Sequence, residues 1–284
     1  MDLTVQDVLS FVESEDIAFI RLAFCDAAGT HKNIAVMPPE LAAAFDKGLL
    51  FQTTGLHLFS EGEEVPETLR LLPDPGTLTA MPWRPQHGKV VHLFCHLLLE
   101  NGAPFAGDQR RILEEASKDR TLLADAEQPF TLYQLDEAGY PTKLPLDEGG
   151  YLDVAPLDKG ENIRRTICLN LEQMGIQPTR SHHAAGSGKN LVKYAAADPV
   201  TAADHLVLFR DLVRTAAGQN GLYAEFDPVT IGLYEAKESE NRAASLDANE
   251  VKMGLSFSGF QVFNQLTSND TNPYRLLGEM IYDI

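Results

Sequence analysis

The residues with the clearest chemical potential lie in one stretch, from Ser181 to Val192. It reads Ser-His-His-Ala-Ala-Gly-Ser-Gly-Lys-Asn-Leu-Val, and so offers two imidazoles and a lysine beside two glycines. Imidazoles bind metal ions, and a lysine that follows glycines can hold a phosphate group. The phosphate-loop pattern G-x-x-x-x-G-K-[ST] does not fit here, because it requires glycine at His183 and a hydroxyl at Asn190.

His182 and His183 are neighbours in the sequence, which limits what they can do together. Successive side chains of a strand point to opposite faces of its sheet. One histidine is therefore expected to face the core and the other the opposite face. This pattern favours a structural histidine with satisfied hydrogen bonds over a two-histidine metal site.

The segments around this stretch alternate between predicted helices and predicted strands, and this pattern predicts an α+β fold. Thr4 and Asp7 form a capping pair for the first predicted helix. The predicted helices are 4–14, 39–45, 108–117, 160–174 and 199–217. The predicted strands are 18–24, 31–36, 68–72, 77–81, 90–99, 128–136, 221–233 and 252–266.

The stretch Asn101-Gly102-Ala103-Pro104 is the best boundary between domains, because glycine and proline interrupt both periodicities there. We therefore predict a first domain over residues 1–102 and a second over 103–284.

The composition disfavours nucleic-acid and membrane binding and favours a cytoplasmic location. Acidic residues number 41 against 23 basic ones, a net charge of −18. Such a surface repels nucleic acids and anionic membranes. No apolar run is long enough to cross a bilayer, and the first residues lack the pattern of a signal peptide. Three scattered cysteines, Cys25, Cys95 and Cys168, are typical of buried, reduced thiols, so we expect a cytoplasmic protein without nucleic-acid or membrane partners.

Several motifs carry a resemblance to a known family. Residues 181–192 closely resemble the glutamine synthetase stretch S-H-H-E-V-G-P-G-Q-H-E-I, and further motifs are similar to that family in the same order. These are Phe19–Asn33 (F-x-R-L-x-F-x-D-x-x-G-x-x-K-N), Leu72–Pro85 (L-x-P-D-x-x-T followed by P-W), Gly102–Arg110 (G-x-P-F and D-P-R), Gly150–Asp153 (G-Y-F-D) and Leu171–Ile176 (L-E-x-M-G-I). The resemblance implies a β-grasp-like N-terminal domain followed by a catalytic-type domain of antiparallel strands with flanking helices. That second domain is expected to be truncated, because the family's last part has no counterpart here.

The positions to which the resemblance assigns chemistry are changed. The two metal-binding glutamates of the histidine stretch correspond to Ala184 and Leu191, and its glutamine corresponds to Lys189. Magnesium and manganese need oxygen ligands, which alanine and leucine lack. The family's E-x-E-F strand keeps its first glutamate as Glu127, but its second is Pro129.

Three further positions depart from the family. The aspartate that the family uses to deprotonate ammonium corresponds to Gln52, which is no base. The histidines of G-S-G-M-H-V-H correspond to Gln261 and Phe263 in a weaker match. We also hypothesise that the Lys189 ammonium replaces a metal charge and neutralises Glu127.

These changes predict a glutamine synthetase-like protein that has lost ATP-dependent ligation of glutamate and ammonia, with no catalytic residue, cofactor or metal expected. Such a protein would bind a partner or a metabolite, either as a homo-oligomer or beside an active glutamine synthetase subunit. The alternative is an active or altered ATP-dependent ligase, which requires ATP and Mg²⁺ or Mn²⁺.

Overall fold

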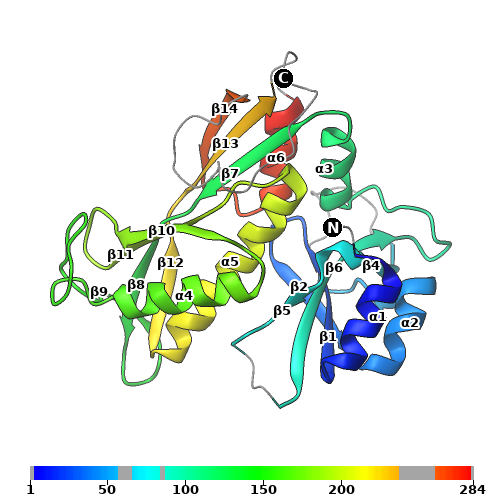
Figure 1. The fold of residues 1–284 in the computed structure, drawn as a ribbon, viewed down its shortest axis with the longest axis horizontal. Helices are drawn as coiled ribbons and strands as arrows, with labels where there is room; N and C mark the ends of the chain where they lie inside the picture. Colours follow the sequence, from blue (N-terminus) through cyan, green and yellow to red (C-terminus); the bar gives the residue numbers. More distant parts are fainter. Residues whose placement is uncertain (1–2, 57–65, 84–86, 237–259, 283–284) are drawn as a thin grey trace. The chain divides into compact units, whose positions relative to one another are not determined.

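Helices and mostly antiparallel strands alternate along the chain in the computed structural model (Figure 1). The structure describes residues 3–56, 66–83, 87–236 and 260–282. The chain divides into unit 1, which holds residues 1–116 and 271–278, and unit 2, which holds residues 117–270 and 279–284.

The division falls at Ser117, later than the boundary predicted at residue 103. Two interactions explain why helix α3 (Gln109–Ser117) belongs with unit 1. The Leu97 N–H donates to Asp108 Oδ2 at 2.9 Å, just before the helix, and Arg110 Nη2 lies 2.9 Å from Asp74 Oδ2. Glycine and proline at 102–104 therefore mark a turn inside unit 1.

Unit 1 is built on one sheet with strand order β2-β1-β6-β4-β3, in which β5 pairs with β6. Strands β1 and β6 are parallel, and the remaining pairs are antiparallel. The sheet strands are β1 (Ile17–Cys25), β2 (His31–Val36), β3 (Leu49–Gln52), β4 (Thr68–Pro73), β5 (Thr79–Ala80) and β6 (Lys89–Leu98). A short 3-10 turn, Pro75–Thr77, precedes β5.

One face of this sheet forms the apolar core of unit 1 with helices α1 (Val5–Ser14) and α2 (Pro38–Lys47). Val8 and Leu41 from these helices, and Leu22 and Leu93 from the two central strands, are fully buried. The predicted cap of α1 is confirmed: the Thr4 side chain accepts the Asp7 N–H, and Asp7 accepts the Thr4 N–H.

Unit 2 contains two antiparallel sheets. The first has the order β10-β11-β8-β12 with β9 paired to β8, and the second has the order β14-β13-β7. Its strands are β7 (Leu122–Glu127), β8 (Phe130–Leu135), β9 (Pro141–Pro145), β10 (Pro178–His183), β11 (Lys189–Tyr194), β12 (Leu222–Phe226), β13 (Val229–Ala236) and β14 (Phe260–Ser268). Helices α4 (Glu161–Gln173) and α5 (Pro199–Gln219) pack against these strands and each other.

Two prolines mark where the chain passes between these sheets. The strand predicted at 221–233 is broken at Pro228 into β12 and β13, and the strand predicted at 128–136 begins only after Pro129, as β8, because proline has no N–H for a sheet ladder. Strand β7 pairs with β13, whereas β8 pairs with β12. The two breaks lie together, since the Asp227 N–H donates to the Pro129 carbonyl at 2.9 Å. This arrangement places Asp227 beside the end of β7.

Helix α6 (Pro273–Tyr282) was not predicted from the sequence. Asn272 precedes it and is fully buried, accepting the Tyr274 and Arg275 N–H groups through its side-chain oxygen. The predicted strand at 252–266 corresponds to β14 from Phe260 onward, and its first part lies outside the described residues. No helix in the described part of the chain is long and apolar enough to span a bilayer.

Candidate functional site

The surviving glutamate position lies in a group of six charged side chains in unit 2. We call this group the ion-pair cluster; it comprises Asp125 and Glu127 on β7, Arg180 on β10, Lys189 and Lys193 on β11, and Asp227 between β12 and β13. Antiparallel pairing of β10 with β11 and the break at Asp227 bring these segments together. Four of these charges form one connected network, and Lys189 and Asp227 form a separate pair, near the place where the sequence predicted a former metal site.

Every cation of the cluster has a carboxylate partner. Lys193 Nζ lies 2.6 Å from Asp125 Oδ2 and 3.6 Å from Glu127 Oε2. Arg180 Nη2 lies 3.1 Å from the same Glu127 oxygen. The Lys193 and Asp125 side chains are only 20% and 14% exposed, so water screens this pair less than a surface pair.

The hypothesis that Lys189 neutralises Glu127 is wrong. Lys189 Nζ instead contacts Asp227 Oδ2 at 2.7 Å. Arg180 and Lys193 already hold Glu127, and the chain break at Pro129 brings the Asp227 carboxylate within reach of Lys189. A lysine still supplies positive charge at this place, but its partner comes from a loop.

Ala184, Leu191 and Pro129 have side chains without a donor atom for a metal. Leu191 is 5% exposed and has joined the apolar core of unit 2. Ala184 closes the β10–β11 hairpin, where its N–H donates to the Lys189 carbonyl at 2.9 Å. These residues do not fit a hard divalent cation, which takes oxygen ligands.

His183 lies in the core, and His182 is half-buried, as the alternation of strand side chains predicted. His183 Nε2 lies 2.9 Å from Asp147 Oδ1, and its Nδ1 lies 2.8 Å from the Ala184 carbonyl oxygen. Both ring nitrogens face acceptors, so the imidazolium form of His183 is the one that satisfies both hydrogen bonds. Although burial opposes the charge, the hydrogen bonds to Asp147 and Ala184 raise the pKa of His183.

Asp147, Asp158 and His183 place one ligand atom each within 4.8 Å of one another, which is close enough for a metal site. Their donor atoms are already used. Asp147 accepts hydrogen bonds from the Gly149, Lys159 and Gly188 N–H groups as well as from His183. Burial alone would raise the pKa of Asp147, but these hydrogen bonds lower it. Arg164 holds Asp158 and also donates to Asn190 at 2.5 Å. The group is a closed structural network.

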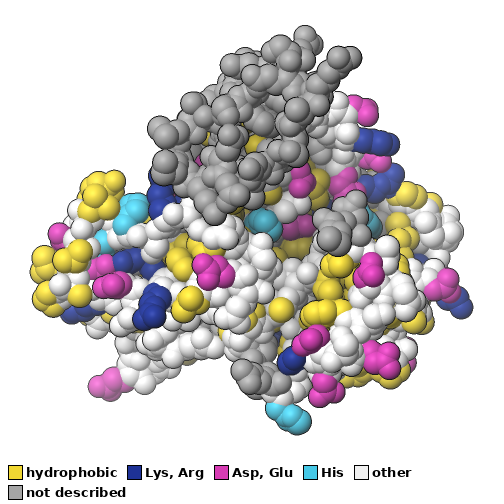
Figure 2. All heavy atoms as spheres, viewed as in Figure 1, with side chains coloured by type: hydrophobic (Ala, Val, Ile, Leu, Met, Phe, Trp, Pro, Cys, Tyr) yellow, Lys and Arg dark blue, Asp and Glu magenta, His cyan; other side chains and the backbone are white. Residues whose placement is uncertain are grey.

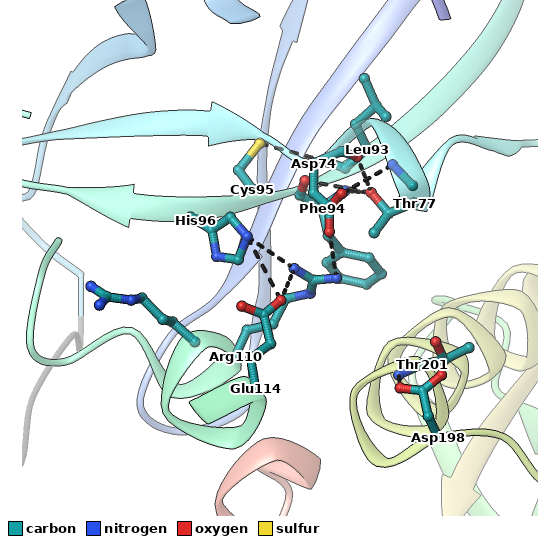
Figure 3. Close-up of polar contacts among 12 residues, drawn as sticks. Asp74, Thr77, Leu93, Phe94, Cys95, His96, Arg110, Glu114, Asp198 and Thr201 are labelled. Atoms are coloured by element: carbon teal, nitrogen blue, oxygen red, sulfur yellow. Dashed lines mark hydrogen bonds and ion pairs between the residues drawn. The ribbon is translucent and has the colours of Figure 1, made fainter. Parts of the chain in front are cut away.

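A second polar group lies in unit 1, where α3 faces β6 (Figure 3). Asp74, His96 and Glu114 also bring ligand atoms within 4.8 Å of one another. Arg110 lies among them: its guanidinium is 2.9 Å from Asp74 and 2.9 Å from Glu114, and 3.4 Å from His96 Nε2. The Arg110 guanidinium thus supplies the positive charge that balances the two carboxylates of this group. Burial opposes a charged His96, but Asp108 and Glu114 raise its pKa.

The remaining predicted positions lie apart in the chain. Gln52 is the exposed last residue of β3 in unit 1. Gln261 and Phe263 lie on β14, where Gln261 pairs with Glu235, but their side chains are outside the described residues, as are Phe257 to Gly259. Asp125, Arg180 and Lys193 were not predicted from the sequence, because strand pairing brings them together and no motif contains them.

Comparison with known proteins agrees with this architecture. The family model described as glutamine synthetase, beta-Grasp domain, matches residues 16–100, and the model described as glutamine synthetase, catalytic domain, matches residues 86–237. The chain belongs to the glutamine synthetase family. The match to the catalytic-domain model covers the ion-pair cluster but ends before Gln261 and Phe263.

Individual relatives show the same family. A glutamine synthetase of Clostridium saccharobutylicum is 35% identical over 279 residues, which cover 94% of this chain and 62% of that protein. One from Staphylococcus aureus strain Mu50 is 35% identical over 91% of this chain and 60% of its own length. This glutamine synthetase homologue therefore spans about 60% of the length of the curated relatives it matches.

Solved structures share the fold. A Plasmodium falciparum glutamine synthetase matches with a TM-score of 0.71 at 17% identity, over 83% of this chain and 54% of that one. A GmaS–ADP complex matches with a TM-score of 0.71 at 22% identity, over 82% and 56%. The predicted glutamine synthetase-like fold with a β-grasp N-terminal part is confirmed.

Proposed function

We propose that this glutamine synthetase homologue does not ligate glutamate and ammonia, and that it acts as a binding protein. The observation that carries the proposal is the ion-pair cluster. Three of the positions that the resemblance assigns to metal ligands are Pro129, Ala184 and Leu191, and the one retained carboxylate, Glu127, is held by Arg180 and Lys193.

Electrostatics explains why this arrangement opposes the family reaction. Transfer of the γ-phosphoryl group depends on positioned metal ions that neutralise its oxygens. A divalent ion at Glu127 would meet the ammonium of Lys193 and would have to break its 2.6 Å contact with Asp125. Side-chain cations already balance the cluster's carboxylates, so the protein needs no bound metal to keep these acids together.

Calorimetric titration tests this proposal. The protein is titrated with MgATP and with Mn²⁺, each with and without glutamate, and an active glutamine synthetase serves as the positive control. We expect no heat of binding at millimolar ligand. Metal-dependent nucleotide binding at micromolar concentration contradicts the proposal.

One observation favours the alternative, an active or altered ATP-dependent carboxylate–amine ligase. Asp125 and Glu127 both contact Lys193, and a metal that displaced this lysine would find carboxylate oxygens there. Under this alternative, the Lys193→Met variant binds Mn²⁺ more tightly than the wild type. Under the main proposal, neither protein binds it.

Partners and compartment are part of the same proposal. A family member that does not catalyse the reaction can act only by binding other molecules. We propose that this chain forms a homo-oligomer or associates with an active glutamine synthetase subunit. Cys95 and Cys168 are free thiols, which supports a reducing, cytoplasmic environment. The acidic surface, with a net charge of −18, disfavours nucleic acid as a partner.

A further inference from the structure

We propose that His31 and His92 of unit 1 bind a divalent transition-metal ion, Ni²⁺ or Cu²⁺, between their imidazole rings. We call these two residues the histidine pair. His31 is the first residue of β2, and His92 lies on β6. Their Nε2 atoms lie 3.0 Å apart. The family motifs quoted above specify neither position. The pair belongs to unit 1 and the ion-pair cluster to unit 2, so the inference is independent of the proposed loss of ligation.

The register of the sheet brings the histidine pair together. Strand β1 lies between β2 and β6. His31 pairs with Cys25 on β1, and His92 pairs with Arg21 on the same strand. Side chains two residues apart on a strand point to the same face, so both imidazoles lie on the face to which Ala23 points. They meet diagonally over Ala23, whose side chain is small enough to leave room for both rings.

Hydrogen bonding leaves a place for a cation between the rings. Two neutral imidazoles that face one another through Nε2 share one proton, because one nitrogen donates and the other accepts. His92 is fully buried, and its Nδ1 has no hydrogen-bond partner among the described residues. A metal ion that replaces the shared proton therefore breaks the bond to His31 and leaves no additional nitrogen of His92 unpaired.

The surroundings keep His92 in the form that binds metal. Burial, and then repulsion from His31 and Arg21, lowers the pKa of His92 well below its usual value. The ring is therefore neutral at physiological pH and has a lone pair to donate. Phe94 packs against both rings, with its centroid 5.6 Å from that of His31 and 4.6 Å from that of His92. His31 is only half-buried, which gives ions access to the pair.

The spacing of the pair selects the metal. Two metal–nitrogen bonds of ~2.1 Å hold their nitrogens ~3 Å apart at a right angle and ~3.4 Å apart at the tetrahedral angle of Zn²⁺. The observed 3.0 Å fits the right-angled coordination of Ni²⁺ and Cu²⁺. Among the described residues no carboxylate, thiol or third imidazole completes a three-ligand group with the pair, so water fills the other positions. Magnesium and manganese, which prefer carboxylate oxygens, are disfavoured here.

Calorimetric titration with NiCl₂ tests the inference, and we expect the wild-type chain to bind one Ni²⁺ ion. His31→Gln and His92→Gln each remove one imidazole and should weaken Ni²⁺ binding by ~10-fold or more. Figure 2 shows histidine side chains at several separate places on one face of the molecule, and a single imidazole also binds metal weakly. The matched control is therefore His182→Gln, which removes a half-buried histidine of unit 2 and should bind Ni²⁺ like the wild type.

Electron paramagnetic resonance of the Cu²⁺-loaded protein identifies the ligands, and we expect hyperfine splitting from two nitrogen nuclei that the His31→Gln variant loses. Thermal melting shows which variants fold, and His31→Gln, at a half-buried position, keeps the inference testable where the buried His92 cannot be replaced. A wild-type chain that binds neither Ni²⁺ nor Cu²⁺ overturns the inference, as does a folded His31→Gln variant that binds both like the wild type. Neither result depends on MgATP or Mn²⁺, so a failure here is separate from a failure of the proposed loss of ligation.

Discussion

At the scale of single residues, the most constrained side chain is His183. It is fully buried, and both of its ring nitrogens face acceptors, Asp147 and the Ala184 carbonyl. A buried cation is stable only when it is paired, and Asp147 provides the pair. The charge on this histidine therefore connects the stability of unit 2 to pH.

Replacing His183 by glutamine removes that charge and keeps one donor. The pKa of His183 is raised in the folded state, so its contribution is complete below the unfolded pKa of ~6.5 and is lost as pH rises through the folded pKa. Asp147 has a lowered pKa, so its contribution is lost only in acid. We expect the variant to be ~2 kcal/mol less stable at pH 6, with a smaller difference at pH 9.

Urea unfolding at both pH values measures these differences. The control is His87→Gln at an exposed position, which should leave stability unchanged at either pH. A difference between wild type and His183→Gln that is constant from pH 6 to pH 9 would show that His183 is neutral in the folded protein.

Lys193 carries the second prediction at this scale. Asp125 Oδ2 contacts Lys193, and its Oδ1 is buried and has no hydrogen-bond partner among the described residues. Lys193→Met therefore leaves a nearly buried carboxylate without its cation. We expect a loss of ~2 kcal/mol in the free energy of unfolding. The matched control is Lys143→Met, whose 84% exposed side chain pairs with Glu225 at 3.4 Å and should contribute less than ~1 kcal/mol. Equal stability of the two variants would contradict the stabilising role assigned to the Lys193–Asp125 pair.

At the scale of elements, the start of α6 is fixed to the turn between β1 and β2. Asn272 donates to the Asp26 and Ala27 carbonyls, and the Thr271 hydroxyl donates to the Ala28 carbonyl. Gly29 has a φ of 72°, and a Cβ there would collide with the Thr271 backbone. The turn thus holds residues 243 positions away in the chain.

Gly29→Ala is therefore expected to release the start of α6 from this turn. Gly139→Ala is a matched control, because Gly139 also has a positive φ (84°) but a Cβ there meets nothing within 4 Å. Both variants carry a backbone cost of ~1 kcal/mol. Only Gly29→Ala should increase amide hydrogen exchange over residues 271–278. Equal exchange in the two variants would contradict the role assigned to this turn.

Much of this element scale was predictable from the sequence, because local signals decide it. The Thr4–Asp7 capping pair and the apolar stripe of 199–217 predicted α1 and α5 within a few residues of their observed ends. The ion pairs were not predictable. Whether Lys189 meets Glu127 or Asp227 depends on where Pro129 and Pro228 break two strands, and no local pattern specifies that contact.

At the scale of the whole molecule, charge opposes the homo-oligomer proposed above. A net charge of −18 makes two copies repel one another. Salt weakens this repulsion, because ions screen exposed charges beyond ~8–10 Å.

Self-association should therefore strengthen with salt. Between 50 and 500 mM NaCl we expect the dissociation constant to fall about fivefold, or ~1 kcal/mol, as repulsion between the two acidic chains is screened. The dissociation constant of an interface held by ion pairs would instead rise with salt. Sedimentation velocity at both salt concentrations measures the change. Weaker association at high salt would show that ion pairs hold the contact between copies.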